Sequence, residues 1–267
     1  TKVAVYMLYR LYVQLFDLEQ RWNVLIIVLM LISMMIGAFG GLTEKTIRRV
    51  LGYQMLNGMP FILVMLAFTS EDSSRALAAG IMYTIHHMVT VGSLILASGA
   101  IEETYGTGDL TKLSGLARRD TIIAWIFAAG AFSVVGFPPF SGMWGKLMIV
   151  FEVARNGGAW AWIAIAMIII ASFAAFLAML RVWREAFWGQ DLPSDKVPDE
   201  LIIRKKLMAP SAALILVSLG MFIFSGVVID AVETAADQLL DTTAYTDTIL
   251  GDDSAALPNI DDIQEGR

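Results

Sequence analysis

The chain has 267 residues, 57% of them hydrophobic, and a mean hydropathy of +0.66. Its long uncharged runs exclude a single water-soluble core and favour an all-α integral membrane protein, because backbone in lipid must satisfy its own hydrogen bonds. The absence of cysteine excludes disulfides and cysteine-based metal or redox sites. No glycine-rich stretch has the spacing of a phosphate-binding loop, and no carboxylate or cysteine stands near the two histidines to complete a metal site. We therefore expect no metal, no cofactor and no nucleic-acid partner.

About seven membrane-crossing helices are expected, because each uncharged run meets or approaches the roughly 20 residues that a helix needs to cross the hydrocarbon layer. In chain order they span about 3–16, 23–42, 50–69, 76–101, 121–155, 159–184 and 207–228. Together they form a transmembrane helical bundle over 1–228. We expect a surface helix at 229–241 and an acidic, disordered tail at 242–267.

The fourth of these helices carries the two histidines of the chain, His86 and His87, in the stretch "MYTIHHMVTVGS". Adjacent helical residues point about 100° apart, so the two histidines cannot share one role, whereas Tyr83 shares a face with His87. Histidine titrates near physiological pH, so a pair at membrane depth favours proton transfer. Histidines that only pack in the core are the alternative.

The spacing of Lys2, at the start of the first helix, favours a lysine at the membrane interface.

The stretch "GFPPFSGMWGK" at residues 136–146 interrupts the fifth helix. Prolines lack an N–H and do not fit a regular helix interior, and glycines loosen the backbone. The four residues of this kind that we take to break the helix are Gly136, Pro138, Pro139 and Gly142. They predict a helix broken at 136–140, a feature that lines binding sites in transporters. Lys146 follows the break at membrane depth, which favours a proton relay over a lysine that snorkels to the interface.

Two further groups of polar residues stand in apolar segments. Gln54, Asn57 and Pro60 in the third helix are placed to admit water. Glu152 and Arg155 form an i,i+3 pair near the end of the broken helix. We interpret this pair as an interfacial salt bridge, with an exit path for ions as the alternative.

Basic residues are unevenly distributed over the loops. One side of the membrane receives the loops 43–49, 102–120 and 181–206, which together hold twelve lysines and arginines. The other side receives four: Arg21, Arg75, Arg155 and Arg267. The excess of basic residues predicts that the first side is cytoplasmic. The C-terminal tail would then lie outside.

Several motifs together resemble those of a known family. These are "LTEKTIRRVLGYQMLNGMPFIL", the histidine-bearing "IMYTIHHMVTVGSLILASGAIEETYGTGDLTKLSGL", "GFPPFSGMWGK" and "RVWREAFWG". In this order they resemble the C-terminal half of the proton-conducting, antiporter-like subunits that Mrp multisubunit sodium/proton antiporters share with respiratory complex I. The last motif is most similar to the D-type subunit of Mrp antiporters.

The resemblance implies a fold and assigns roles to residues. Members of the family have fourteen helices with two inverted repeats, each containing one broken helix, and the helices predicted here would be the last seven, with the second repeat complete. Lys146 matches the lysine of the second broken helix, and Lys2 matches the central lysine between the half-channels. His87 matches the buried histidine, with His86 beside it. Val91 departs from the pattern, because many relatives have a lysine there.

The resemblance also implies a function. We expect a non-enzymatic, multi-pass subunit in the plasma membrane that relays H⁺ along an axis of Lys2, His86, His87, Tyr83 and Lys146 in exchange for Na⁺. Its partners would be other subunits of the antiporter complex and the lipid bilayer. Because the first repeat is mostly missing, the chain by itself is not expected to transport. A proton-pumping subunit of a redox complex like complex I or a membrane-bound hydrogenase, and a non-conducting scaffold subunit, are the alternatives.

Overall fold

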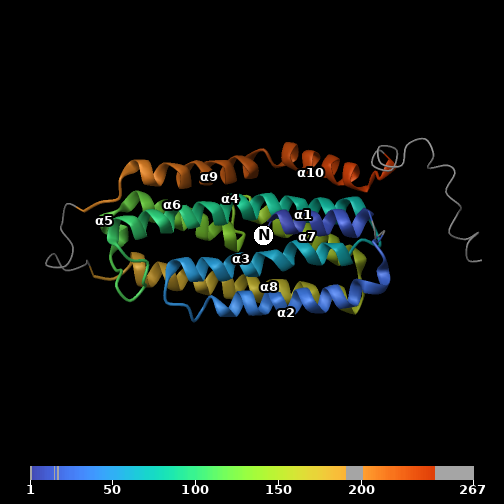
Figure 1. The fold of residues 1–267 in the computed structure, drawn as a ribbon, viewed down its shortest axis with the longest axis horizontal. Helices are drawn as coiled ribbons and strands as arrows, with labels where there is room; N and C mark the ends of the chain where they lie inside the picture. Colours follow the sequence, from blue (N-terminus) through green and yellow to red (C-terminus); the bar gives the residue numbers. More distant parts are fainter. Residues whose placement is uncertain (1, 15, 17, 191–200, 244–267) are drawn as a thin grey trace, which may run out of the picture.

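In the computed structural model, which describes residues 2–14, 16, 18–190 and 201–243, long helices lie side by side along one axis (Figure 1). In chain order the elements are α1 (Lys2–Gln14), η1 (Gln20–Trp22), α2 (Asn23–Gly40), α3 (Ile47–Leu63), η2 (Val64–Ala67), α4 (Ser73–Tyr105), α5 (Leu116–Arg119), α6 (Thr121–Val135), α7 (Gly142–Asn156), α8 (Gly158–Val182), η3 (Trp183–Phe187), α9 (Lys205–Ile223) and α10 (Ser225–Leu240). Over the described ranges there is no strand, only one isolated bridge between Thr46 and Asp109.

Five helical stretches among the described residues are long and apolar enough to cross a membrane. They are Gln20–Gly40, Ile47–Ala67, Ser73–Tyr105, Gly158–Phe187 and Lys205–Ile223, and α6 is a shorter apolar helix. The expected class, an all-α membrane protein, is confirmed. The count of seven spans stays a prediction, because α1 has 13 residues and α6 and α7 have 15 each.

Local chemistry sets several helix ends. The side chains of Thr46 and Asp72 accept hydrogen bonds from backbone N–H groups three residues later, and α3 and α4 begin directly after them. The left-handed residues Gly106 (φ +69°) and Gly136 (φ +100°) follow the last residues of α4 and α6. These ends fix where the polar residues of each helix stand relative to the bundle.

The C-terminal helices differ from the sequence-based expectation. The last span was expected to continue to 228 and a surface helix to follow at 229–241, but α9 ends at Ile223 and α10 begins at Ser225. Gly220 and Gly226 flank this interruption and have low helix propensity. α10 packs against α4, where the hydroxyl of Ser74 donates to Asp237 at 2.5 Å. The predicted tail at 242–267 lies almost entirely outside the described residues.

The core consists of two apolar clusters, and buried polar side chains lie between them. In α4 the first cluster ends at Tyr83 and the second begins at Val91; in α3 the second ends at Leu51 and the first resumes at Phe61. The side chains in between, here called the polar layer, are at most 4% exposed: Gln54, Asn57, His86, His87, Thr90, Ser133, Ser141 and Ser218. Burial of this kind requires hydrogen-bond partners.

The loops rich in basic residues meet at the end of the bundle where α5 lies (left in Figure 1). The N–H of Leu110 donates to the carbonyl of Lys45 at 2.8 Å, which joins the loop after α4 to the loop after α2. The guanidinium of Arg118 donates to the carbonyl of Gly189 at 2.7 Å, which joins α5 to the segment after η3. The three loops are therefore connected to one another at a single end of the bundle.

Candidate functional site

The site is built around the interruption between α6 and α7. α6 ends at Val135, Gly136 adopts a positive φ, and the peptide bond between Pro138 and Pro139 is cis. Helix resumes at Gly142. The polypeptide is thus non-helical between two short helices, and it returns toward the bundle interior at Ser141, which is fully buried.

Gly142 lets the start of α7 approach its neighbours closely. A Cβ atom at this position would lie 1.9 Å from the carbonyl oxygen of Ser133 and 2.9 Å from Cε1 of His86. Both distances are too short for a real side chain. The close packing of α7 on α6 and α4 therefore depends on a glycine at the first position of α7.

Lys146 reaches back across the interruption. Its Nζ donates to the carbonyl of Val135 at 2.7 Å and to the hydroxyl of Ser172 on α8 at 2.9 Å. The Val135 carbonyl belongs to the last turn of α6, where carbonyls lack helical partners and carry the negative end of the helix dipole. Nζ also lies 5.4 Å from the ring centroid of Phe61. Among the described residues no carboxylate forms an ion pair with Lys146.

Aromatic rings connect the neighbourhood of Lys146 to the histidines. The ring of Phe61 stacks on Tyr83 with 5.1 Å between centroids. The Tyr83 ring in turn lies 5.4 Å from His86 and 6.0 Å from His87. The structure thus brings Lys146, Tyr83 and both histidines into one group, with Phe61 between the lysine and the tyrosine.

The two histidines face different helices. Nδ1 of His86 lies 2.8 Å from the hydroxyl oxygen of Ser141, toward the interruption. Nε2 of His87 lies 3.3 Å from the backbone carbonyl oxygen of Gln54, on α3. A Cβ on Gly58 would lie 1.8 Å from this same Nε2. The ring of His87 therefore fills the space that a side chain at Gly58 would need.

The face of α3 near His87 carries buried amides without a protein partner. Nε2 and Oε1 of Gln54 and Oδ1 of Asn57 have no hydrogen-bond partner among the described residues. Leaving such a group unsatisfied costs about 1–3 kcal/mol, and ordered water is the usual partner in protein interiors. The sequence predicts that water enters the helix at these amides.

Lys2 contacts α3 at the residue after Gly58, the glycine against which His87 packs. Its Nζ contacts the sulfur of Met59 on α3 at 3.2 Å, a weak acceptor. No hydrogen bond joins it to either histidine in the described part of the chain. Val91, the position at which the motif resemblance implies a lysine in many relatives, is 2% exposed and lies in an apolar cluster. On this side the structure therefore offers buried amides without a hydrogen-bond partner among the described residues, and no second buried cation at position 91.

Glu152 and Arg155 lie near the far end of α7. Nη1 of Arg155 lies 3.1 Å from Oε1 of Glu152, and the side chains of Arg155 and Glu152 are 51% and 11% exposed. Beside them, the amide of Asn156 donates to the carbonyl of Phe68, at 3.0 Å, which connects α7 to the segment before α4. The structure does not bring this pair into contact with Lys146 or the histidines.

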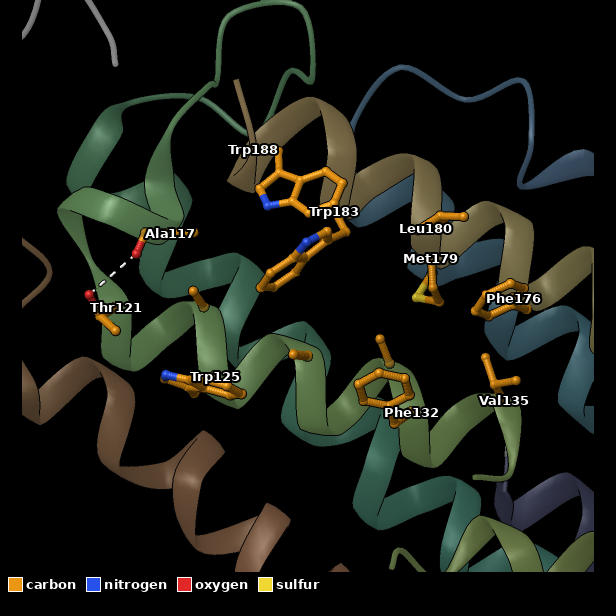
Figure 2. Close-up of a pocket in the computed structure, with 13 residues that line it drawn as sticks. Ala117, Thr121, Trp125, Phe132, Val135, Phe176, Met179, Leu180, Trp183 and Trp188 are labelled. Carbon is orange, nitrogen blue, oxygen red and sulfur yellow. Dashed lines mark hydrogen bonds between the residues drawn. The ribbon is translucent and has the colours of Figure 1, made fainter. Parts of the chain in front are cut away.

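A separate groove of about 540 Å³ lies between α6 and α8. Figure 2 shows Trp125 and Phe132 of α6 facing Phe176, Met179 and the tryptophans that follow α8. Of the described residues that line it, none carries a charge. The groove is thus apolar and distinct from the polar layer.

Several functional candidates are absent from the sequence-based set. They are hydroxyl side chains that face the site from α4, α6, the interruption, α8 and α9: Thr90, Ser133, Ser141, Ser172 and Ser218. Their one sequence signal is that each interrupts a strongly apolar segment. Serine and threonine are common in membrane helices, so this signal does not tell which of them meet.

A bundle of apolar helices with a buried polar layer and an interrupted helix is a multi-pass membrane protein. The family profile described as NADH:quinone oxidoreductase/Mrp antiporter, TM, matches residues 1–177, and the chain belongs to this family. The resemblance inferred from the motifs is thereby confirmed.

Curated relatives match nearly the whole chain. The D-type subunit of the Na(+)/H(+) antiporter of Alkalihalophilus pseudofirmus is 26% identical over 251 residues, which cover 94% of this chain and 49% of the relative. The D-type subunit of the Na(+)/H(+) antiporter of Bacillus subtilis is 29% identical over 252 residues, with the same shares covered. The chain thus spans about half the length of these relatives.

Solved structures agree with the fold. A chain of the Mrp complex from Dietzia sp. matches with a TM-score of 0.84 and 30% identity, over 94% of this chain and 53% of that one. A chain of respiratory complex I from Thermus thermophilus matches with a TM-score of 0.69, over 82% and 45%. The identity in the second case is 20%, so that likeness concerns the fold alone.

Proposed function

We propose that this chain is the C-terminal half of a proton-translocating subunit of a Mrp-type multisubunit Na⁺/H⁺ antiporter, and that it is a transporter subunit and not an enzyme. The observation that carries the proposal is the position of Lys146. Its ammonium lies at the interruption of a membrane helix, held by a carbonyl, a hydroxyl and an aromatic face. Relatives named as D-type subunits of such antiporters support the assignment.

The arrangement suits a group that takes up and gives off a proton. An ammonium near the bilayer centre costs roughly 2.5–3.5 kcal/mol on insertion scales. The carbonyl of Val135 and the hydroxyl of Ser172 offset part of this cost, and both groups also accommodate a neutral amine, because the hydroxyl can donate instead of accept. Lys146 can therefore hold either protonation state without rebuilding its surroundings.

The proposed path runs from Lys2 to His87 and His86 and from there, past Tyr83, to Lys146. Contacts support the second half of this path, since Tyr83 lies next to both histidines and to Phe61. In the first half, the unpartnered amides of Gln54 and Asn57 are polar groups that bridging water would satisfy between α1 and His87. Glu152 and Arg155 form a salt bridge near the outer end of α7, with an exit role as the alternative.

The proposed setting is the plasma membrane, with other antiporter subunits as partners, Na⁺ as the exchanged ion and lipid around the bundle. The end that gathers the basic loops is proposed to be cytoplasmic, which puts the C-terminal tail outside. The apolar groove between α6 and α8 suits contact with lipid or with a helix of another subunit.

The test is sodium-dependent proton movement in inverted vesicles that contain the full-length subunit with its partner subunits. Lys146→Ala and Lys146→Met are expected to abolish transport in complexes that assemble normally by immunoblot. Lys112→Ala is the control, because Lys112 is an exposed lysine of the loop after α4. Transport that persists in both Lys146 variants would favour a non-conducting scaffold, the role that Val91 also fits.

A further inference from the structure

Four hydroxyl groups from four parts of the chain form a closed ring with His86. They are Thr90 of α4, Ser133 of α6, Ser141 of the interruption and Ser218 of α9. Their successive contacts are His86 Nδ1 to Ser141 Oγ at 2.8 Å, Ser141 to Ser218 at 2.8 Å, Ser218 to Ser133 at 3.0 Å, Ser133 to Thr90 at 2.8 Å, and Thr90 back to Nδ1 at 3.3 Å. We call this set the hydroxyl ring.

The hydroxyl ring is sealed inside the protein. Its four hydroxyl residues are 0% exposed and His86 is 1% exposed. The N–H of Ser141 adds a longer contact to the Ser218 hydroxyl, at 3.4 Å. Because buried polar groups are costly when left without partners, the ring must satisfy most of its donors internally.

The number of hydroxyl hydrogens in the ring favours one tautomer of neutral His86. Each hydroxyl has one hydrogen to donate, and three of the four are used in the three contacts between oxygens. One hydroxyl hydrogen is then left for Nδ1, so the count closes only if Nδ1 accepts. If Nδ1 carried a proton, that proton would donate to a hydroxyl oxygen of the ring. One hydroxyl hydrogen would then have no acceptor within the ring.

We propose that the hydroxyl ring holds Nδ1 of neutral His86 as a hydrogen-bond acceptor and thereby confines the exchangeable proton of this histidine to Nε2. The shorter contact makes Ser141 the donor, with hydrogens running from Thr90 through Ser133 and Ser218 to Ser141. Ser141, Ser218, Ser133 and Thr90 are positioning residues that act through His86. This inference rests on the proposed function, because it defines which nitrogen of His86 takes part in the relay.

Protonation of His86 would have a defined consequence for the ring. An Nδ1–H donates to Ser141, so Ser141 must donate to Ser218 instead, and the direction of every hydroxyl hydrogen reverses. No covalent bond to oxygen breaks, because each hydroxyl only rotates. The charge on His86 is thereby coupled to the contacts that hold the interruption against α6 and α9.

Nitrogen NMR of isotope-labelled histidine in the full-length subunit, within its assembled complex, tests the proposal. The signal of His86 is assigned by its loss in His86→Gln. At a pH where the side chain is neutral, wild type is expected to show an unprotonated, hydrogen-bonded Nδ1. Ser141→Ala should leave Nδ1 unprotonated but weaken its hydrogen bond, because Thr90 then becomes the donor from 3.3 Å.

The combined variant Thr90→Val with Ser141→Ala removes both donors. The ratio of the Nε2–H tautomer to the Nδ1–H tautomer should then fall by about fivefold, the effect expected from the loss of one neutral hydrogen bond. Ser211→Ala is the matched control. Ser211 is equally buried on α9, but it pairs with Ser93 outside the ring. Its variant should keep the wild-type signal.

A proton on Nδ1 of neutral wild-type His86 would overturn the proposal, and this measurement needs no variant to fold. An unchanged tautomer ratio in the combined variant, or an equal change in Ser211→Ala, would overturn it as well. The NMR outcome is independent of transport. Failure of the proposed function in the Lys146 vesicle test and failure of the proposal for the hydroxyl ring are therefore distinguishable.

Discussion

His86 and His87 are adjacent in sequence, yet each is packed against a glycine of a different element. The ring of His87 occupies the place of a side chain at Gly58 in α3, and His86 lies against Gly142 at the start of α7. Because a glycine leaves no Cβ, the imidazoles come close to the neighbouring backbone. The positions of the two histidines thus depend on residues that have no polar chemistry of their own.

Gly58→Ala is expected to displace His87 and to destabilise the subunit by about 1–3 kcal/mol, the usual effect of overpacking a buried site. Sodium-dependent proton movement should fall in parallel, because His87 leaves the carbonyl of Gln54. Gly52→Ala is the control on the same helix, where an added Cβ meets nothing within 4 Å. Normal thermal stability and transport in Gly58→Ala would contradict the role given to this packing.

At the scale of elements, a buried tyrosine of α1 forms a hydrogen bond to the bundle. The hydroxyl of Tyr9 donates to the carbonyl of Ile62 at 2.6 Å, near the point where α3 tightens into η2. The same oxygen would lie 1.9 Å from a Cβ at Gly80, so α1 also approaches α4 closely. Since Lys2 is on α1, its distance from the other residues of the proposed relay depends on this attachment.

Tyr9→Phe is expected to lower the free energy of unfolding by about 1–3 kcal/mol, because it leaves the Ile62 carbonyl buried without its donor. Tyr6→Phe provides the comparison, since Tyr6 is 57% exposed on the same helix. Thermal unfolding of the purified full-length subunit in detergent measures both variants. Equal melting temperatures for the two would show that the Tyr9 hydroxyl does not hold α1.

At the scale of the whole molecule, the polar layer lies between two apolar clusters, and the basic loops gather at one end. This division places His86 and His87 between the two apolar clusters, away from both ends of the bundle. Charges at membrane depth are tolerated when they face the protein interior or water. The arrangement therefore gives a direction to the molecule, with the two histidines between a basic end and an opposite end.

The proposed orientation predicts which loop cysteines react with a thiol reagent in each kind of membrane vesicle. Lys112→Cys, in the exposed loop after α4, should react with a membrane-impermeant thiol reagent only in inverted vesicles. Glu71→Cys, exposed between η2 and α4 at the opposite end, should react only in right-side-out vesicles. The reverse pattern would invert the proposed orientation, and equal reaction on both sides would exclude a fixed orientation.

The sequence by itself determined the class, the family and the ionisable residues of the candidate site. Composition and uncharged runs are sums over local segments, so they need no knowledge of packing, and the same holds for the prolines and glycines between α6 and α7. The motifs around His87 and Lys146 carried the family assignment, which the comparisons confirmed. The roles given to Lys2, Lys146 and the histidines stay predictions.

Only the tertiary structure decided which groups meet. Ser218 reaches Ser141 across 77 positions of sequence, and Ser133 reaches Thr90 across 43. A hydroxyl in an apolar helix has no periodicity that predicts such a partner, because the contact is set by how whole helices cross. The packing of α10 on α4, with Ser74 hydrogen-bonded to Asp237, is likewise a contact between segments far apart in the sequence.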